Sequence, residues 1–202
     1  VSGGGRDIRT ENNSTRIVNE AGGIIRSNST SGTNDIRRQG GGNSTGNQQS
    51  FRNLGTLEVL QNNFNIGNTN NNFRFDSITD TELLEGTYRV LSDSSRARLR
   101  IIRGSVNNQN PDIGDADQSN FDGSIVTIRA PATVVLSGTG AGTGPGAGAE
   151  LPQLGEISTL EGGLAVHNSV VLPVSSSLIV QGWLGGDGAV DLQGGTLINE
   201  GL

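Results

Sequence analysis

Apolar and polar residues alternate with a period of two in several short stretches of the chain. The alternation is visible at Leu57 and Val59 and again at Tyr88 and Val90. A period of two places every second side chain on one face of an extended strand. No stretch keeps the 3.6-residue period of an amphipathic helix, and the nearest one, 77–84, is short and interrupted by Thr and Asp. The pattern therefore predicts an all-β protein.

The predicted strands recur in short phrases that open with a glycine and a small residue. Such phrases begin at Gly55, Gly86 and Gly195, and turns rich in Asn, Asp and Gly separate them. One explanation is a β-sandwich built from hairpins, and the other is a parallel β-solenoid, in which strands and corners repeat from coil to coil. Strands in 160–202 are too short to bury a core as hairpins, but stacked coils would bury one. We therefore expect a right-handed parallel β-solenoid in 54–202, with a β-sandwich as the alternative.

Two stretches lack the apolar residues that would order them. The first is a Gly-, Asn- and Ser-rich lead segment, 1–53, and the second is a Gly-rich insertion at 137–150. Ordering a residue costs about 1–2 kcal/mol of backbone entropy, which contacts from outside would have to offset. We expect an irregular lead segment that acts as an assembly arm against an adjacent subunit or coil. The protein would then have itself as its partner, and it would be a homopolymer or one tract of a longer solenoid.

Three phrases give the chain a recognisable texture. They are Glu-Gly-Thr-Tyr-Arg-Val at 85–90, Gly-Trp-Leu-Gly-Gly-Asp-Gly-Ala-Val-Asp-Leu at 182–192 and Gly-Thr-Leu-Ile-Asn-Glu-Gly at 195–201. This texture resembles the coils of secreted bacterial β-helix proteins, namely filamentous-haemagglutinin-like adhesins and autotransporter passenger domains. The resemblance implies an extracellular or cell-surface location and a structural or adhesive role. The uneven spacing of the phrases and the polar first quarter depart from a regular passenger domain.

Composition narrows the classes of function. The chain contains no Cys and only one His, which excludes disulfides, thiol chemistry and Cys-ligated zinc. The net charge of −6 argues against nucleic-acid binding, which requires a basic surface. No apolar run reaches the length of about 18–20 residues that spans a bilayer, so we expect no membrane insertion.

The densest charged feature is a run of arginines that alternates with apolar residues. In a strand, Arg96, Arg98 and Arg100 share one face, and Arg103 follows shortly after them. Guanidinium groups bind sulfate, phosphate and carboxylate through paired hydrogen bonds, so this face is a candidate site for a surface glycan of acidic type. The alternatives are a solvated face neutralised by the acidic loop that follows, and a subunit contact.

That acidic loop carries four aspartates, Asp112, Asp115, Asp117 and Asp122. Carboxylate oxygens in a turn suit Ca²⁺, which makes this loop a candidate calcium site and calcium the one cofactor considered. The spacing matches neither an EF-hand nor the calcium-binding β-roll repeat. The alternative is a surface loop that pairs with the arginines.

Catalytic patterns are sparse. His167 is the only histidine, and no Gly-x-Ser-x-Gly motif accompanies it. Trp183 lies between Gly182 and Leu184 and is a candidate for stacking on a sugar or for a subunit contact. We expect a non-enzymatic extracellular structural or adhesive protein, a segment of a cell-surface fibre or adhesin. The alternative is a carbohydrate-active β-helix of the polysaccharide lyase or hydrolase type that acts on an acidic glycan.

Overall fold

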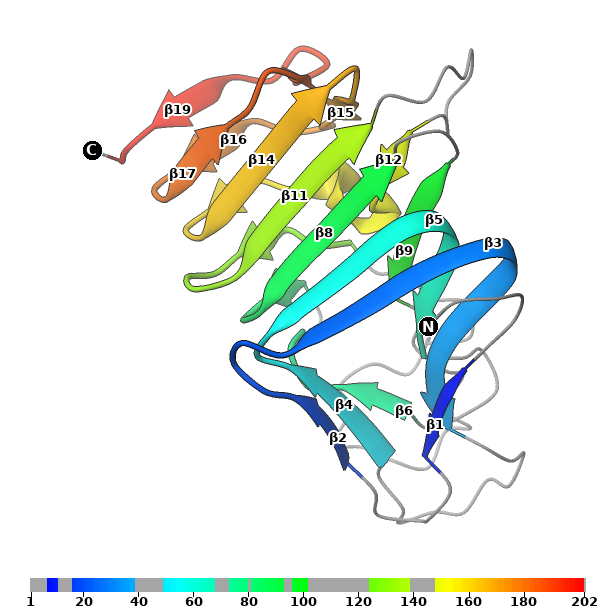
Figure 1. Ribbon diagram of the computed structural model, residues 1–202. Helices are drawn as coiled ribbons and strands as arrows, with labels where there is room; N and C mark the ends of the chain where they lie inside the picture. The colour runs from blue at the N-terminus through cyan, green and yellow to red at the C-terminus, as the bar shows by residue number, and fades with distance from the viewer. Residues whose placement is uncertain are drawn as a thin grey trace, which may run out of the picture.

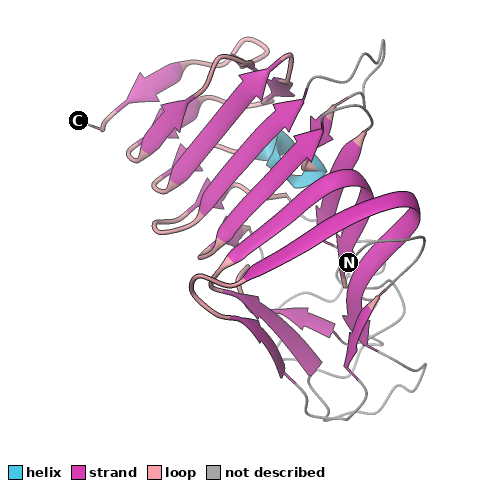
Figure 2. Ribbon diagram, in the orientation of Figure 1, coloured by secondary structure: helices cyan, strands magenta, loops and turns pink. Residues whose placement is uncertain are grey.

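The computed structural model describes residues 7–10, 16–38, 49–67, 73–79, 81–92, 96–101, 124–138 and 148–201. Within these ranges the protein is all-β, as predicted, with a single 3-10 helix, η1 (Pro152–Glu156). Figure 2 shows strands along nearly the whole described chain, with η1 as the one helical turn.

The main sheet contains nine strands, and seven of them form a continuous row. In spatial order these are β1 (Ile8–Thr10), β3 (Ile24–Arg38), β5 (Thr56–Ile66), β8 (Thr87–Ser92), β11 (Thr133–Gly138), β14 (Gly163–Asn168) and β17 (Trp183–Gly185). The second halves of β3 and β5 bend away from this row. There the second half of β5 pairs with β9 (Ala97–Ile101), and β9 pairs with β12 (Ala149–Glu150). Figure 1 shows this row running from the long curved β3 to β17 near the C-terminus.

Three smaller sheets complete the structure. The five-stranded sheet contains β7 (Glu82–Leu83), β10 (Thr127–Ile128), β13 (Thr159–Leu160), β16 (Leu178–Val180) and β19 (Leu197–Asn199). The three-stranded sheet contains β2 (Arg16–Asn19), β4 (Gln49–Asn53) and β6 (Phe73–Phe75), and the two-stranded sheet contains β15 (Val171–Pro173) and β18 (Ala189–Asp191).

Every pairing between named strands in the described chain is parallel. An isolated bridge between Ile78 and Leu83 is antiparallel. We call the stretch of chain that contributes one strand to the main row a rung. Because neighbours in the main row come from successive rungs, each rung lies beside the next one. A β-sandwich of antiparallel hairpins, the alternative that we considered from the sequence, is therefore wrong for these sheets.

The core follows from the period-two alternation. Leu57 pairs with Tyr88 on the next rung, and Tyr88 pairs with Val134. All three side chains are almost fully buried. The ring of Phe75 lies across an edge of Tyr88, with ring centroids 6.1 Å apart, and stacks on Phe51 at 5.5 Å. Stacked rungs thus place apolar side chains beside apolar side chains, and few apolar residues suffice to form a buried core.

The lead segment is not irregular where the structure describes it, which corrects our expectation for 1–53. Within it, Ile24–Arg38 forms the longest strand in the part of the chain that the structure describes. The strands of this segment pair with each other and with β5 beyond residue 53. Backbone pairing is independent of side-chain hydrophobicity. The buried polar side chains also find partners: the Asn34 amide donates to the Ser27 hydroxyl at 3.0 Å. Polar side chains of this segment therefore take part in pairing within the described chain.

Candidate functional site

The predicted alternation of the arginine run is present in the structure. Arg98 and Arg100 lie on the half-buried face of β9, and Arg96 directly precedes the strand. Ala97 and Leu99 point to the core and are fully buried. Arg103 lies outside the described residues. The structure thus brings Arg98 and Arg100 to one face of β9, with Arg96 directly before the strand.

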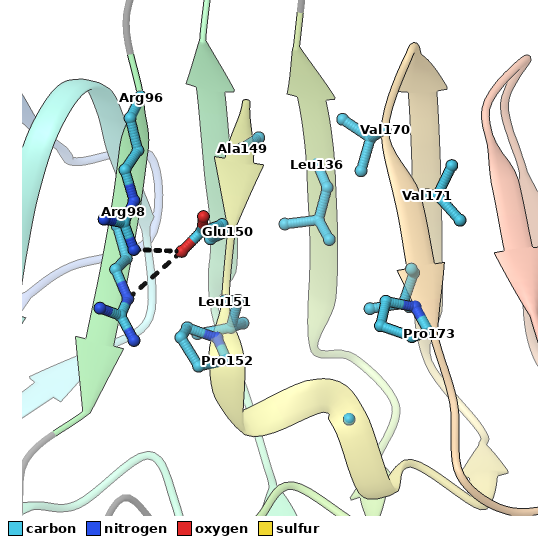
Figure 3. A pocket seen from close by; sticks show the side chains of 12 residues that line it. Arg96, Arg98, Leu136, Ala149, Glu150, Leu151, Pro152, Val170, Val171 and Pro173 are labelled. Carbon is cyan, nitrogen blue, oxygen red and sulfur yellow. Dashed lines mark hydrogen bonds and ion pairs between the residues drawn. The ribbon is translucent and has the colours of Figure 1, made fainter. Parts of the chain in front are cut away.

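A carboxylate that sequence reasoning missed lies among these arginines. Because β12 pairs with β9, Glu150 stands beside Arg98. Its Oε2 is 2.7 Å from Nη2 of Arg96 and 3.4 Å from Nε of Arg98 (Figure 3). Its Oε1 is buried and has no hydrogen-bond partner within the described chain. Glu150 is 54 positions from Arg96 in the sequence, with β10 and β11 between them, so only the strand register could have predicted the contact.

A cavity of about 440 Å³ opens beside this charged cluster. Its inner surface is apolar and includes Leu136, Ala149, Leu151, Val170 and Leu172. Its rim combines the ion cluster of Arg96, Arg98 and Glu150 with Pro152, Val171 and Pro173. Figure 3 shows β12 and the arginines on one side, β15 on the other side, and Leu136 of β11 behind the space between them. One side of the cavity is therefore charged and its interior is apolar.

The cavity exists because neighbouring rungs separate at this point. On the main row, β11 and β14 of these rungs pair over six residues. Their continuations do not pair with each other, since β12 pairs only with β9 and β15 only with β18 among the described strands. The helix η1 follows β12 immediately and carries the chain out of the strand direction. The gap between β12 and β15 exposes the core side chain of Leu136 to the cavity.

The remaining candidates from the sequence do not line this cavity. Trp183 lies on β17, is half exposed, and its indole packs against Gly163, where a Cβ would come within 2.5 Å of Nε1. The four aspartates of the candidate calcium loop, in 112–122, lie outside the described residues. Elsewhere in the described chain, no group of three or more acidic or histidine side chains is placed to hold a metal ion.

His167 takes part in a surface contact rather than a cleft. Its Nδ1 is 3.2 Å from Oδ1 of Asp187, and both side chains are exposed. The backbone N–H of Asn168 donates to the same oxygen at 2.8 Å, and this bond, with the His167 contact second, lowers the pKa of Asp187. The Ser137 hydroxyl accepts a hydrogen bond from the Asn168 amide at 2.7 Å. The arrangement fixes the turn after β14, where Asn168 has a φ of 59°.

Comparisons with protein-family models, with curated proteins and with solved structures found no match for this chain. Among the described residues, no helix combines the length and apolar character needed to cross a bilayer.

Proposed function

We propose that this chain is a right-handed parallel β-solenoid with a non-enzymatic structural or adhesive role, as a segment or subunit of an extracellular fibre or adhesin. The observation that carries the proposal is the parallel pairing of successive rungs, which continues through the described chain to an open edge at each of β17 and β19. Such stacking yields a rigid rod from little apolar mass. The absence of Cys is consistent with secreted bacterial proteins of this shape.

Ion pairs between rungs support the proposed structural role. Glu58, whose side chain is almost completely buried, contacts Arg26 of the preceding rung and Arg89 of the following rung, the latter at 3.0 Å. A second such cluster places Arg129 between two glutamates of its neighbouring rungs. A charge shared between two partners on adjacent rungs opposes both separation and slippage of the stack.

The outer edge of β19 can pair with a further strand, either of a second copy or of a following coil of the same chain. Thr196 O accepts from Leu178 N at 2.9 Å, and Glu200 N donates to Val180 O at 2.8 Å. By the alternation of a parallel ladder, the backbone groups of Leu197 and Asn199 point away from β16. Leu197 is half exposed. This edge offers free backbone donors and acceptors beside apolar side chains, which is the arrangement that pairs with a further strand.

The experiment blocks this edge in the whole chain. In Asn199→Pro the outward N–H is lost, whereas Asn199→Ala keeps it and removes only the side chain. Sedimentation velocity and negative-stain electron microscopy measure assembly as a function of concentration. We expect end-to-end species for the wild type and for Asn199→Ala, and a marked reduction for Asn199→Pro. A wild type that stays monomeric up to its solubility limit would overturn the proposal of self-assembly.

A further inference from the structure

We infer that the outer edge of β19 binds β2 of a second copy of this chain, so that copies join head to tail with Asn199 opposite Asn19. This inference rests on the proposed self-association and identifies the surface that β19 contacts. It is carried by the apolar side chains, the backbone groups and the charge at the two ends of the stack.

β2 and β19 expose apolar side chains at opposite ends of the stack. β2 lies with β3 at one end of the described chain and β19 at the other (Figure 1). Leu197 and Ile198 of β19 are 50% and 41% exposed, and Val18 of β2 is 36% exposed. Leu197 pairs with Leu178, which is fully buried. A strand added beyond β19 would therefore continue a column of core side chains.

β2 and β19 also share a sequence pattern and a position in the rung. Residues 17–20 read Ile-Val-Asn-Glu, and residues 197–200 read Leu-Ile-Asn-Glu. The carbonyl oxygens of Asn19 and Val180 each accept from two N–H groups of the following corner, at 2.8 and 3.0 Å. Asn199 pairs with Val180 and therefore lies in the same corner column as Asn19. The first rung thus has the residues that would continue this column beyond β19.

The two backbone edges are complementary in this register. Leu197 and Asn199 direct their N–H and C=O groups away from β16. Because Asn19 O bonds to the rung of β4, the backbone groups of Val18 point to the other side, at the edge of the described sheet. With Asn199 opposite Asn19, the Val18 N–H would donate to the Leu197 carbonyl, and the Asn199 N–H to the Val18 carbonyl. The parallel ladder of the rungs would then continue from one copy into the next.

The asparagine side chains would extend an existing ladder. Asn19 Nδ2 donates to Oδ1 of Asn53 at 2.7 Å, and both side chains are buried. In the proposed register, Asn199 Nδ2 would donate to Asn19 Oδ1 in the same way. One neutral hydrogen bond is a small part of a strand contact, so Asn199→Ala should still associate, about two- to fivefold more weakly than the wild type.

Charge disfavours a contact between two C-terminal ends. The segment 183–201 contains three acidic residues, Asp187, Asp191 and Glu200, all exposed, and no basic residue. Two such ends would repel each other, whereas the one charged residue of β2 is Arg16. A contact between different ends also leaves both outer ends open, which extends the assembly into a fibre.

The contact is confined to β2 and β19. A Cβ at Gly201 would lie 3.2 Å from the carbonyl oxygen of Gly182, so Gly201 already covers that corner of the preceding rung. With β2 on β19, β3 of the second copy would lie one strand further from β17 than neighbouring strands of the main row lie. Because small interfaces bind weakly, we expect association to depend steeply on protein concentration.

Cross-linking of cysteine variants tests the register, because the chain contains no Cys. Val18→Cys and Ile198→Cys, which the register places opposite each other, are mixed and treated with a short bismaleimide. We expect a cross-linked dimer from the mixture and little product from either variant alone. The matched control is Ile24→Cys, which is on the same rung as Val18 and 62% exposed, and its yield with Ile198→Cys should be about tenfold lower. Circular dichroism confirms that each variant folds.

Charge variants test the same register without a cross-linker. Glu20 and Glu200 would lie opposite each other, one position beyond the Asn pair, and would repel. Glu20→Arg should therefore strengthen association in sedimentation velocity by about three- to tenfold, and adding Glu200→Arg should reverse the gain. Glu156→Arg, at the exposed end of η1, changes the net charge equally and should have a smaller effect.

The outcomes distinguish this inference from the proposed self-association. Association of the wild type without cross-linking of the mixture would overturn the inference alone. Strong cross-linking of Ile198→Cys by itself, or an equal gain from Glu156→Arg and Glu20→Arg, would do the same. A wild type that stays monomeric would instead overturn the self-association, and the inference with it.

Discussion

A column of glycines at the corner before the main row should be essential for stacking. Five of the six residues that directly precede the paired positions of successive rungs are glycines, namely Gly23, Gly55, Gly86, Gly162 and Gly182, and the sixth is Ala132. At Gly162, a Cβ would lie 2.2 Å from the carbonyl oxygen of Ala132 and 2.7 Å from that of Arg129. Both contacts are with backbone atoms, which cannot move aside by a change of side-chain rotamer. We therefore predict that Gly162→Ala forces adjacent rungs apart.

The magnitude follows from the contacts that must yield. Carbon and oxygen approach to about 3.3 Å without repulsion, so the rungs must shift by about 1 Å at this corner. The shift lengthens the bonds from Gly163 N to Ala132 O and from Gly162 N to Ile128 O, now 3.0 and 2.9 Å. Overpacking and weakened hydrogen bonds together cost about 2–4 kcal/mol. For a chain of this length the midpoint of thermal unfolding should fall by about 5–15 °C.

Gly155→Ala is the matched control, because its Cβ meets open space and its backbone needs no positive φ. It should be neutral or stabilise the protein by a few tenths of a kcal/mol or so through the unfolded chain. Thermal and urea unfolding, followed by circular dichroism, measure both variants. A loss of less than about 0.5 kcal/mol in Gly162→Ala would refute the reasoning, since it would mean that the corner has room for a methyl group.

Three further changes test other contacts. Glu58→Gln should lower the free energy of unfolding, measured in urea, by about 1–2 kcal/mol, because it removes the buried negative charge between two arginines. The same substitution at the exposed Glu200 should change the free energy of unfolding little. The hydrogen bond from Arg52 lowers the pKa of Glu85 from 4.5, so this stabilisation is present above about pH 4.5 and is lost as the pH falls through the folded pKa. Unfolding free energies measured between about pH 6 and pH 3 should thus fall more steeply for the wild type than for Arg52→Gln. Phe75→Ala should lower the free energy of unfolding by about 3–5 kcal/mol. An unchanged midpoint of urea unfolding would contradict the place of Phe75 in the aromatic stack.

Sequence periodicity predicts the strands whose rungs bury apolar residues. Thr87–Ser92 alternates between buried and outward positions as Tyr88 and Val90 indicate. Parallel stacking is predicted from the short strands in 160–202, and the structure pairs those strands in parallel. The same reasoning fails at Ile24–Arg38. The apolar pair Ile24 and Ile25 predicts only the start of this strand. Beyond it Ser27 and Asn34 are buried and joined by a hydrogen bond, so hydrophobicity carries no signal for the rest of the strand.

The cavity illustrates a second limit. Alternation predicts that Arg96 and Arg98 share a face, because that depends on neighbours along one strand. The contact with Glu150 depends on the register between β9 and β12, which residues far apart in the sequence determine. The gap between rungs depends on where η1 interrupts strand pairing. The proline at the start of this helix, Pro152, is a common signal for the beginning of a helix, but it carries no information about a neighbouring strand.

The charge distribution favours one direction for the self-association that we propose. Backbone pairing alone tolerates slips of register, because it does not depend on which side chains are opposed. Arg26 and Glu58, 32 residues apart, and Arg52 and Glu85, 33 residues apart, pair only when each rung keeps its place on the next. At a net charge of −6, the sides of two copies would repel each other. The edge at β19 instead presents Leu197 and free backbone groups. The self-association that we propose should therefore occur along the stacking direction rather than laterally.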